Sequence, residues 1–506
     1  MLQLQLSLAP LLLDAAHSST HSSTHSSLTP VQWVQTALHT TDRLTAQPAL
    51  TFTETTAEAA AFQVSIDPNK QFQKILGFGG ALTQSSATVY RDLPAPLQQQ
   101  IIEAYYGESG IGYSTGRLPI HSCDFSVDIY TFDDVEGDKT LRNFDTAVKY
   151  DQELSLPLIH DALKANPGLL FYGSPWSPPA WMKDNNDMLH GGKLLPEYRE
   201  SWAAYFAKWI TAYEAQGVKV WGVTVQNEPE AVQSWESCIY TAEETRDFVA
   251  EHLGPTLNKA HPDVKILGWD HNKDNIKEWA DTLLGDNSSS AEYVDGIAFH
   301  WYSGSCFNNV KDVSTSYPDA ILLPSEACFE LTVLEDDASD EAWLVNGTWS
   351  KGEGYGYDIL GDLESGSVGW TDWNILLDRE GGPNHVGNYC DAAIIADTTT
   401  DDAAIYFHPQ YYYMGHFSKF LAPNSVRVET TVTGGTKTDD CSWPYGGCDG
   451  NTIHVTSWQQ ADGSLSVVAM NCGDDDKDMS LSVSGVEGEL RNTVPANSIQ
   501  TLVIPM

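Results

Sequence analysis

The stretch VWGVTVQNE, residues 220–228, joins an apolar run to an amide and a carboxylate, Asn227 and Glu228, and a proline follows at once. Valine, tryptophan and threonine suit a strand that is buried on both faces, as in a parallel sheet. A carboxylate at the end of such a strand can cap a helix, pair with a cation or take part in a reaction. The rest of the chain decides among these three roles.

Seven other stretches repeat this pattern, each with an apolar run of strand length, a polar or aromatic end and a connecting segment after it. They are residues 74–82, 111–120, 169–176, 264–272, 294–302, 321–327 and 368–376. Eight strands alternating with helices over about 300 residues predict a (β/α)8 barrel, which is an α/β fold. A doubly wound open sheet is the alternative, but GFGGAL at 77–82 lacks the spacing of a glycine-rich phosphate loop.

Two of the connecting segments carry clear helix signals. In residues 196–217 five aromatic residues recur every three or four positions, which places them on one helix face. They are Tyr198, Trp202, Tyr205, Trp209 and Tyr213. The stretch TAEE at 241–244 has capping-box spacing, with Glu244 three residues after Thr241, and predicts a helix that begins there.

The chain changes character near residue 426, where alternating apolar and polar residues replace the strand-helix repeat. Asp462-Gly463 predicts a hairpin turn within this tail, and the apolar alternation near residues 49–67 predicts strands that join it. We expect a lead-in over 1–30, a strand-forming segment over 31–73, a barrel over 74–425 and a small all-β sandwich over 426–506. A carbohydrate-binding module is the alternative for the sandwich, but no obvious aromatic row decorates it, so we expect a structural companion of the barrel.

The charge of the chain limits its partners. It has 27 basic and 69 acidic residues, a net charge of −42 and a pI near 4.4. At neutral pH such a surface repels nucleic acid and anionic membranes, so we expect no nucleic-acid partner. Because Asp and Glu titrate near pH 4, most of this charge is lost at roughly pH 4–5. The composition therefore fits an extracellular or acidic compartment.

The N-terminus and two short motifs favour the secretory pathway. Leu6–Leu13 is an apolar run of signal-peptide length, although no Lys or Arg precedes it, and the low-complexity HSSTHSSTHSSL follows. Elsewhere the chain has no apolar run long enough to span a membrane. Asn287 and Asn346 begin N-glycosylation sequons. We expect an extracellular or lysosome- or vacuole-like location.

Cysteine spacing predicts one local disulfide. The eight cysteines form an even set, and only Cys441 and Cys448, which bracket SWPYGG, are near neighbours in sequence. We therefore expect these two to pair, and we expect others to be free and buried.

Chemically useful side chains gather at the carboxyl ends of the predicted strands, where a barrel has its active site. They are Arg117, Asp124, Trp176, Asn227, Glu228, Asp270, His271, His300, Tyr302, Glu326, Trp370, Asp372 and Asn374. Two glutamates among aromatic rings and neutral polar groups suit the hydrolysis of a glycosidic bond. A phosphate site would need more cations than Arg117, and no HEXXH motif indicates zinc. We expect no metal and no cofactor.

Eight blocks of sequence follow one another along the chain: ILGFGGALT, GYSTGRLPIHSCDFS, SPWSPPAWMK, TVQNEPE, IAFHWY, LLPSEAC, GWTDWNILLDREGGPN and MGHFSKFLAPNSVRV. In these blocks the sequence resembles the glucosylceramidase (acid β-glucosidase) family of retaining (β/α)8-barrel glycosidases. The blocks extend from about residue 74 to residue 427, and the set is far more specific than any single block.

The resemblance implies a role for each matched position. Glu228, in the N-E-P block, corresponds to the acid/base, and Glu326, in the S-E-A block, corresponds to the nucleophile. Asn227 corresponds to the residue that binds the sugar 2-hydroxyl. The other implied sugar-binding positions are Asp124, Trp176, Trp370 and Asn384, while His300, Tyr302 and Arg117 line the site and orient the two carboxylates.

These positions imply a double displacement with net retention, in which burial and the charge of Glu326 raise the pKa of Glu228. The expected substrate is glucosylceramide, with peripheral contact to lipid, and the alternatives are a β-1,6-glucan or another β-glucoside. A carbohydrate-binding relative without activity would be expected to have lost Glu228 or Glu326, and both are present. The sequence does not indicate an oligomeric state.

Overall fold

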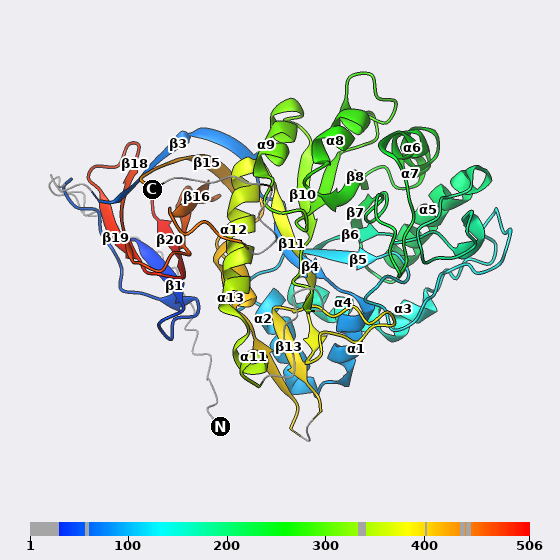
Figure 1. Ribbon diagram of the computed structural model, residues 1–506, viewed down its shortest axis with the longest axis horizontal. Coiled ribbons are helices and arrows are strands. Elements are labelled where there is room, and N and C mark those ends of the chain that lie inside the picture. Colours follow the sequence, from blue (N-terminus) through cyan, green and yellow to red (C-terminus); the bar gives the residue numbers. More distant parts are fainter. Residues whose placement is uncertain (1–29, 56–59, 332–340, 400–401, 436–440, 442–446) are drawn as a thin grey trace, which may run out of the picture.

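The computed structural model describes residues 30–55, 60–331, 341–399, 402–435, 441 and 447–506. Within these residues the chain forms a barrel of parallel strands ringed by helices and a β-sandwich beside it (Figure 1). No helix in this part of the chain is both long and apolar enough to cross a membrane.

Eight parallel strands form the barrel, and each lies inside a stretch where we expected one. They are β4 Gly77–Ala81, β5 Thr115–Pro119, β6 Leu170–Ser174, β7 Val220–Thr224, β8 Lys265–Asn272, β9 Gly296–His300, β10 Ile321–Glu326 and β11 Gly369–Asn374. The order β10-β9-β8-β7-β6-β5-β4-β11 follows the chain apart from β11. Backbone bonds from Val368 to Leu322, 3.0 Å, and from Trp373 to Ala327, 2.8 Å, join the two remaining edges. The barrel fold is confirmed.

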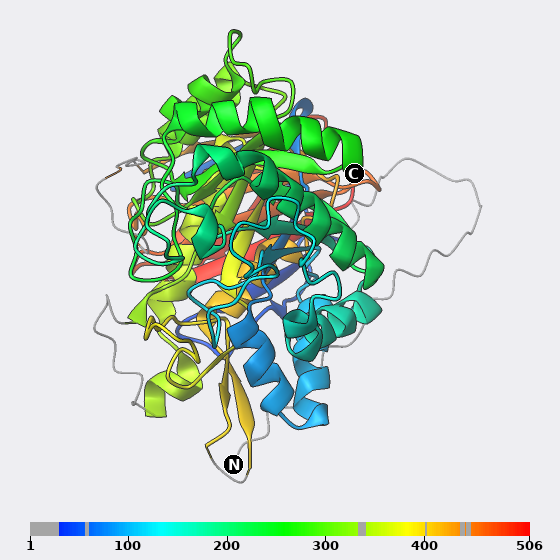
Figure 2. The same cartoon turned by 90° about the vertical axis from the view of Figure 1, so that its right-hand side faces the viewer.

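Helices lie outside the strands in both views (Figure 1, Figure 2). Those connected with the barrel are α1 Gln84–Asp92, α2 Ala95–Tyr106, α3 Lys149–Glu153, α4 Ser155–Ala165, α5 Arg199–Ala215, α6 Ala242–Phe248, α7 Gly254–Ala260, α8 Ile276–Leu284, α9 Phe307–Ser316, α11 Glu341–Asn346, α12 Trp349–Ser365 and α13 Pro409–Ser418. Short helical turns span Ala180–Met182 and Pro196–Tyr198, and a π-helical turn, Val249–Leu253, joins α6 to α7. A small sheet near the barrel mouth consists of β12 Leu377–Asp378, β13 Ile394–Asp397 and β14 Ala404–Phe407.

The helix signals in the sequence are confirmed. On α5, Trp202, Tyr205 and Trp209 are buried in the largest hydrophobic core. At α6, the Thr241 hydroxyl accepts from the Glu244 backbone N–H, and the Glu244 carboxylate accepts from the Thr241 N–H, so the capping box is complete.

The sandwich combines strands from both ends of the chain. They are β1 Gln32–Ala37, β2 Thr45–Ala46, β3 Phe62–Lys74, β15 Val426–Thr433, β16 His454–Gln459, β17 Leu465–Asn471, β18 Lys477–Val483, β19 Leu490–Val494 and β20 Ser498–Ile504. The first strand, β1, pairs antiparallel with the last, β20, while β3 lies between β15 and β18. The hairpin expected at Asp462-Gly463 joins β16 to β17, and Gly463 takes a φ of 90° in the turn.

Helices α12 and α13 lie between the barrel strands and the sandwich (Figure 1). From α13, the ring nitrogens of His416 lie 2.9 Å from the hydroxyls of Thr36 on β1 and Thr501 on β20. From α12, Glu364 accepts a hydrogen bond from Thr456 on β16, 2.7 Å. Buried polar contacts therefore fix the two units against each other.

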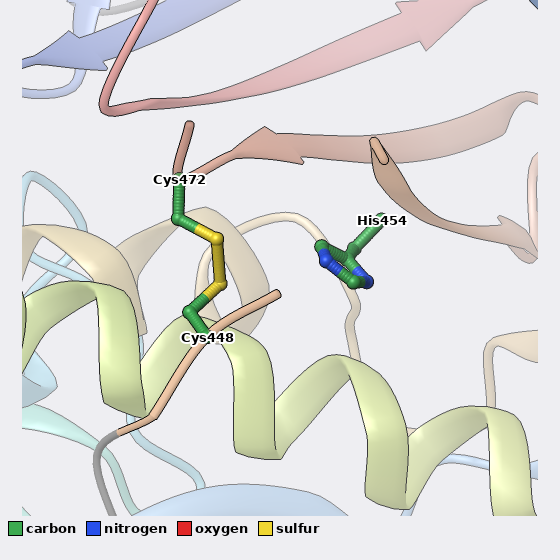
Figure 3. Close-up of side chains that lie close together, drawn as sticks. All are labelled: Cys448, His454 and Cys472. Atoms are coloured by element: carbon green, nitrogen blue, oxygen red, sulfur yellow. A yellow bond between two sulfur atoms is a disulfide. The ribbon is translucent and has the colours of Figure 1, made fainter. Parts of the chain in front are cut away.

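The disulfide that we expected between Cys441 and Cys448 is wrong. Cys441 pairs with Cys306, just before α9, and Cys448 pairs with Cys472, just after β17 (Figure 3). Proximity in sequence is misleading here, because each cysteine lies against a segment distant in the chain. The Cys306–Cys441 bond links the barrel covalently to the insertion between β15 and β16.

Packing between β6 and α5 leads to a stability prediction. A Cβ atom at Gly173 would run into the indole of Trp209, which is fully buried. We expect Gly173→Ala to lower the free energy of unfolding by about 1–3 kcal/mol, because this core cannot accept an added methyl group. Chemical denaturation checks this, with Gly168→Ala, in an exposed turn, as the matched control. Equal stability of the two variants would contradict the packing argument.

Candidate active site

Arg117, on β5, is the polar centre of the barrel mouth, and its side chain is fully buried. Its guanidinium donates to Glu326 Oε2, to Asn227 Oδ1 at 2.9 Å and to Asp270 Oδ2 at 2.8 Å, while Nε donates to Ser174 Oγ at 3.0 Å. A planar guanidinium with a fixed set of donors suits such divergent acceptors. One cation thereby positions the ends of several strands.

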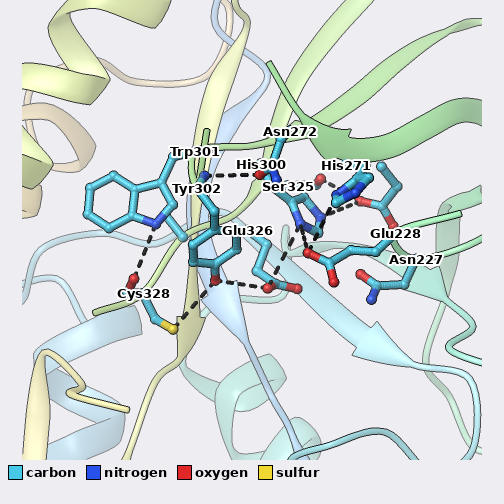
Figure 4. Close-up of polar contacts among 12 residues, drawn as sticks. Asn227, Glu228, His271, Asn272, His300, Trp301, Tyr302, Ser325, Glu326 and Cys328 are labelled. Atoms are coloured by element: carbon cyan, nitrogen blue, oxygen red, sulfur yellow. Dashed lines mark hydrogen bonds and ion pairs between the residues drawn. The ribbon is translucent and has the colours of Figure 1, made fainter. Parts of the chain in front are cut away.

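Glu326, at the end of β10, is held on both carboxylate oxygens (Figure 4). Oε2 accepts from Arg117, and Oε1 accepts from the hydroxyl of Tyr302 at 2.9 Å. The side chain is 9% exposed. A carboxylate held in this way, beside a cation and with slight access to solvent, has the surroundings that a nucleophile needs.

Glu228, just after β7, faces two imidazoles (Figure 4). Its Oε1 lies 3.2 Å from Nδ1 of His300 and 3.6 Å from Nδ1 of His271. The residue has a φ of 47°, in the left-handed region that non-glycine residues rarely adopt, and its N–H donates to Asp270 O at 3.0 Å. Uncommon backbone geometry of this kind concentrates at active sites.

The separation of the two glutamates fits retaining chemistry. His300 Nδ1 lies 3.2 Å from Glu228 Oε1 and 3.9 Å from Glu326 Oε1. By adding these distances, the two oxygens can be at most about 7 Å apart, whereas carboxyl separations are roughly 5–5.5 Å in retaining glycosidases and roughly 6.5–9.5 Å in inverting ones. This upper bound for the two Oε1 atoms includes the retaining range.

The expected rise in the pKa of Glu228 is not what the structure shows. Burial does act to raise the pKa, but the hydrogen bonds and charges of His271 and His300 outweigh it and hold the pKa of Glu228 below its usual range. Burial would lower the pKa of His300, yet Glu326, Asp270 and Glu228 raise it to about 9. Of the two side chains in the Glu228–His300 contact, His300 is therefore the one that carries the proton.

Asp270 and His271 stood among the strand-end side chains in the sequence, but the family resemblance gave them no role, and both reach the candidate site. The pairing of β8 with β9 is irregular between Trp269 and His271, and Trp269 and Asp270 have φ values of 69° and 64°. Because of this bulge, both adjacent side chains face the site. Asp270 bonds to Arg117 and lies 3.1 Å from His300, while His271 lies beside Glu228.

The structure corrects the expectation that Trp370 lines the sugar site. Alternation along β11 turns Trp370 outward, where its Nε1 donates to Asp358 on α12 at 3.0 Å. Trp373, three residues later, instead stacks on Trp176 at 5.2 Å between ring centroids, and both rings lie over Arg117. Trp373 is therefore the β11 tryptophan on the active-site side.

The position of Asn384 is also different from our expectation. Its Oδ1 accepts from the N–H groups of Val386, Gly387 and Asn388, so it organises a loop. The side chain that reaches the site is that of Asn388, which donates to Asp124 Oδ2 at 3.3 Å. The sequence signal for this residue was a second asparagine four positions beyond Asn384.

Asp124 is positioned to accept further hydrogen bonds. It is 6% exposed, and its Oδ1 is buried without a hydrogen-bond partner among the described residues. Burial, followed by the charges of Glu326, Glu236 and Glu228, raises the pKa of Asp124 well above its usual range. A buried acceptor without a donor is the feature expected where substrate hydroxyls bind.

The structure thus brings most of the sequence-predicted residues together. Arg117, Asn227, Glu228, His300, Tyr302 and Glu326 form one contact network, with Trp176 stacked on its cation and Asp124 nearby. Within the part of the chain that the structure describes, two sets have the separations of metal ligands, namely Glu228 with His271 and His300, and Cys448 with His454 and Cys472. The sulfurs of the second set are bonded to each other (Figure 3).

A (β/α)8 barrel with this pair of carboxylates defines a retaining glycoside hydrolase. Residues 75–421 match the family model described as the glycosyl hydrolase family 30 TIM-barrel domain. Residues 424–502 match the family 30 beta sandwich domain. The chain belongs to glycosyl hydrolase family 30.

Individual relatives agree with this assignment. Lysosomal acid glucosylceramidase of Mus musculus is 34% identical over 87% of this chain and 82% of its own length. Endo-1,6-beta-D-glucanase of Neurospora crassa is 30% identical over 90% of each chain. SrfJ from Salmonella typhimurium, a solved structure, is 29% identical with a TM-score of 0.83 and covers 94% of this chain and 100% of its own. The resemblance seen in the sequence blocks is confirmed.

The two β11 tryptophans provide a test of which one contacts the sugar. We expect Trp373→Leu to raise KM for a β-glucoside roughly twofold to tenfold, since an aromatic contact contributes about 0.5–1.5 kcal/mol. We expect Trp370→Leu to lower the free energy of unfolding by about 2–5 kcal/mol and to leave KM nearly unchanged. Steady-state kinetics and chemical denaturation of both variants check this. If instead Trp370→Leu raised KM and Trp373→Leu mainly lowered stability, Trp370 would be the tryptophan that contacts the sugar.

Proposed function

We propose that the protein hydrolyses the β-glucosidic bond of glucosylceramide, releasing glucose and ceramide with retention at the anomeric carbon. The observation that carries this proposal is the contact network in which Arg117, Tyr302 and His300 hold Glu326 and Glu228 at a separation suited to retention. The choice of lipid substrate draws support from the glucosylceramidase relative, which is 34% identical over most of the chain.

In the first step Glu326 attacks the anomeric carbon, and the glycosidic oxygen leaves with a proton from Glu228. Arg117 and Tyr302 each hold one oxygen of Glu326, which fixes the direction of attack. The proton reaches Glu228 from Nδ1 of His300, 3.2 Å away. A glucosyl ester on Glu326 and free ceramide result.

In the second step water attacks the ester while Glu228 accepts the proton of that water. Esterification removes the negative charge of Glu326, which had favoured the protonated form of His300. The Glu228–His300 pair therefore gives up its proton more readily at this stage, as a general base requires. Both steps use the same two side chains in reversed roles.

The glucose unit binds through acceptors and donors around the carboxylates. Asn227, held by Arg117, offers its amide to the 2-hydroxyl, where a hydrogen bond that strengthens in the transition state has most effect. Asp124 Oδ1 accepts from hydroxyls on the far side of the ring. Trp176 and Trp373 provide apolar surface next to these groups.

Exposed apolar side chains on the loops that follow β5 and β7 support a lipid aglycone. Ile129 and Val135 are 47% and 48% exposed after β5, and Val232 is 67% exposed after β7. Loops after the carboxyl ends of the strands surround the mouth of a barrel. We propose that these side chains contact the hydrocarbon part of the substrate or the lipid surface that contains it.

We also propose a route through the secretory pathway to an acidic or extracellular compartment. The two disulfides require oxidising conditions during folding, and both sequon asparagines, Asn287 and Asn346, are exposed. The apolar run expected as a signal peptide lies outside the described residues. A mass decrease on treatment with a peptide N-glycosidase would support this route, and unmodified sequons in a eukaryotic secretion host would count against it.

Parallel assays define the substrate. We expect glucose release from glucosylceramide in detergent micelles at about pH 5 and little release from a β-1,6-glucan, with products measured by chromatography. The glucan is the matched alternative substrate, because the Neurospora relative is an endo-1,6-beta-D-glucanase and its similarity extends over a comparable share of this chain. Cleavage of the glucan alone would overturn the lipid proposal and leave the two-glutamate chemistry intact.

The acid/base role has its own test. We expect Glu228→Gln to lower kcat on glucosylceramide by about 10²–10⁴-fold, the usual contribution of general acid–base catalysis. With a dinitrophenyl glucoside, whose leaving group needs no proton, the rate of the burst phase should fall much less. Glu230→Gln is the control, since Glu230 is exposed two residues away and should retain wild-type rates. Equal losses on both substrates would contradict the assignment.

The shared proton predicts a pH effect. Because the pKa of His300 is raised to about 9, the Glu228–His300 pair keeps its proton across neutral pH and loses it above that range. His300→Gln cannot hold this proton, so we expect the alkaline limb of the kcat/KM profile to move to lower pH. A limb that stays in place while kcat falls would mean that His300 only orients Glu228.

A further inference from the structure

Two buried cysteines lie behind the active site with their sulfurs almost in bonding contact. Cys328 and Cys390 are both about 1–2% exposed, and their Sγ atoms are 2.8 Å apart. Two unbonded sulfurs do not ordinarily approach so closely. Cys328 follows Glu326 by two residues, and Cys390 follows Asn388 by two residues.

Backbone hydrogen bonds hold these two segments side by side. Asp391 N–H donates to Phe329 O at 2.8 Å, Leu331 N–H donates to Tyr389 O at 2.8 Å, and Glu330 forms an antiparallel bridge with Cys390. Disulfides need neighbouring backbones and side chains that point toward each other. Both conditions are met, so bond formation requires only a small movement of the side chains.

We propose that Cys328 and Cys390 form a third disulfide, made while the protein folds, which ties the segment of the nucleophile to the loop of Asn388. The oxidant is a disulfide-bearing thiol oxidant, the class of co-reactant that also forms Cys306–Cys441 and Cys448–Cys472. One cysteine thiolate attacks the oxidant and releases one of its sulfurs as a thiol. The second cysteine thiolate then attacks the mixed disulfide and releases the other, so two protons and two electrons pass to the oxidant.

The burial of the two thiols determines when the bond can form. In the folded protein both thiols are shielded from solvent, and burial raises the pKa of the Cys390 thiol to about 11 and that of Cys328 well above its usual range. Since the thiolate is the reactive form, exchange with an oxidant or reductant is slow after folding. The bond is therefore a permanent structural link and not a reversible switch.

The link has a direct bearing on the site. On one side, Cys328 Sγ lies 3.4 Å from the hydroxyl of Tyr302, which donates to Glu326 (Figure 4). On the other side, the loop of Cys390 carries Asn388 to Asp124. A covalent bond here fixes the sugar-binding loop relative to the nucleophile. This assignment does not depend on which β-glucoside is the substrate.

Peptide mapping tests the bond in the wild-type protein. The protein is unfolded without reductant in the presence of excess N-ethylmaleimide, deglycosylated and digested with trypsin. Cys328 and Cys390 are the single cysteines of tryptic peptides 312–351 and 380–419. We expect these two peptides to be recovered joined, with maleimide only on Cys123 and Cys238, and to separate after reduction. Maleimide on both Cys328 and Cys390 would overturn the proposal.

A variant tests the role of the link. We expect Cys390→Val to lower Tm by several degrees and to raise KM for the substrate more than it lowers kcat, because the Asn388 loop is released. Cys238→Val is the matched control, since Cys238 is also buried and forms no disulfide in the structure. If peptide mapping shows the bond in the wild-type protein and Cys390→Val nevertheless has the wild-type KM, the anchoring role is refuted. An equal change of KM in Cys238→Val would also refute it.

Discussion

A single buried cation, Arg117, is the constraint on which the active site depends. Its guanidinium reaches Glu326, Asp270 and Asn227 from the floor of the mouth, where neither its own side chain nor that of Asp270 is exposed. Without this charge, two carboxylates would be buried close together with no compensation, a situation that costs several kcal/mol. One residue of β5 therefore sets the positions of hydrogen-bond acceptors that come from β7, β8 and β10. The network is polar, dense and rigid, as the positioning of a nucleophile requires.

The surroundings of Arg117 divide the work between strands. The bulge in β8 supplies Asp270 for the cation and His271 for Glu228 from adjacent positions, which a regular strand would turn to opposite faces. Rings of Trp176 and Trp373 cover the guanidinium and limit access of water to it. Electrostatic interactions are stronger where water is excluded, so this cover increases the influence of the charge on Glu326.

Much of the fold and the central chemistry could be predicted from sequence, because both rest on local patterns. All eight barrel strands and the positions of Glu228 and Glu326 follow from apolar runs, strand ends and the family blocks. The errors have another origin. Which of Trp370 and Trp373 faces the site depends on the geometry of a twisted strand end. Which of Asn384 and Asn388 reaches the site depends on the course of a loop. The pairing of Cys441 and the proton of Glu228 depend on residues far away in the chain, namely Cys306 and His300.

The sandwich has a consequence for biosynthesis. Its first strand, β1, pairs with its last, β20, and β3 needs β15 and β18 as neighbours. A ribosome delivers the barrel residues long before β20 emerges, so the barrel can condense on the nascent chain while β1 has only β2 beside it and β3 still lacks β15 and β18. These early strands present unpaired backbone edges throughout that interval, which is when a chaperone would be needed. Truncation near the C-terminus would leave that exposure permanent, although every active-site residue would already have been made.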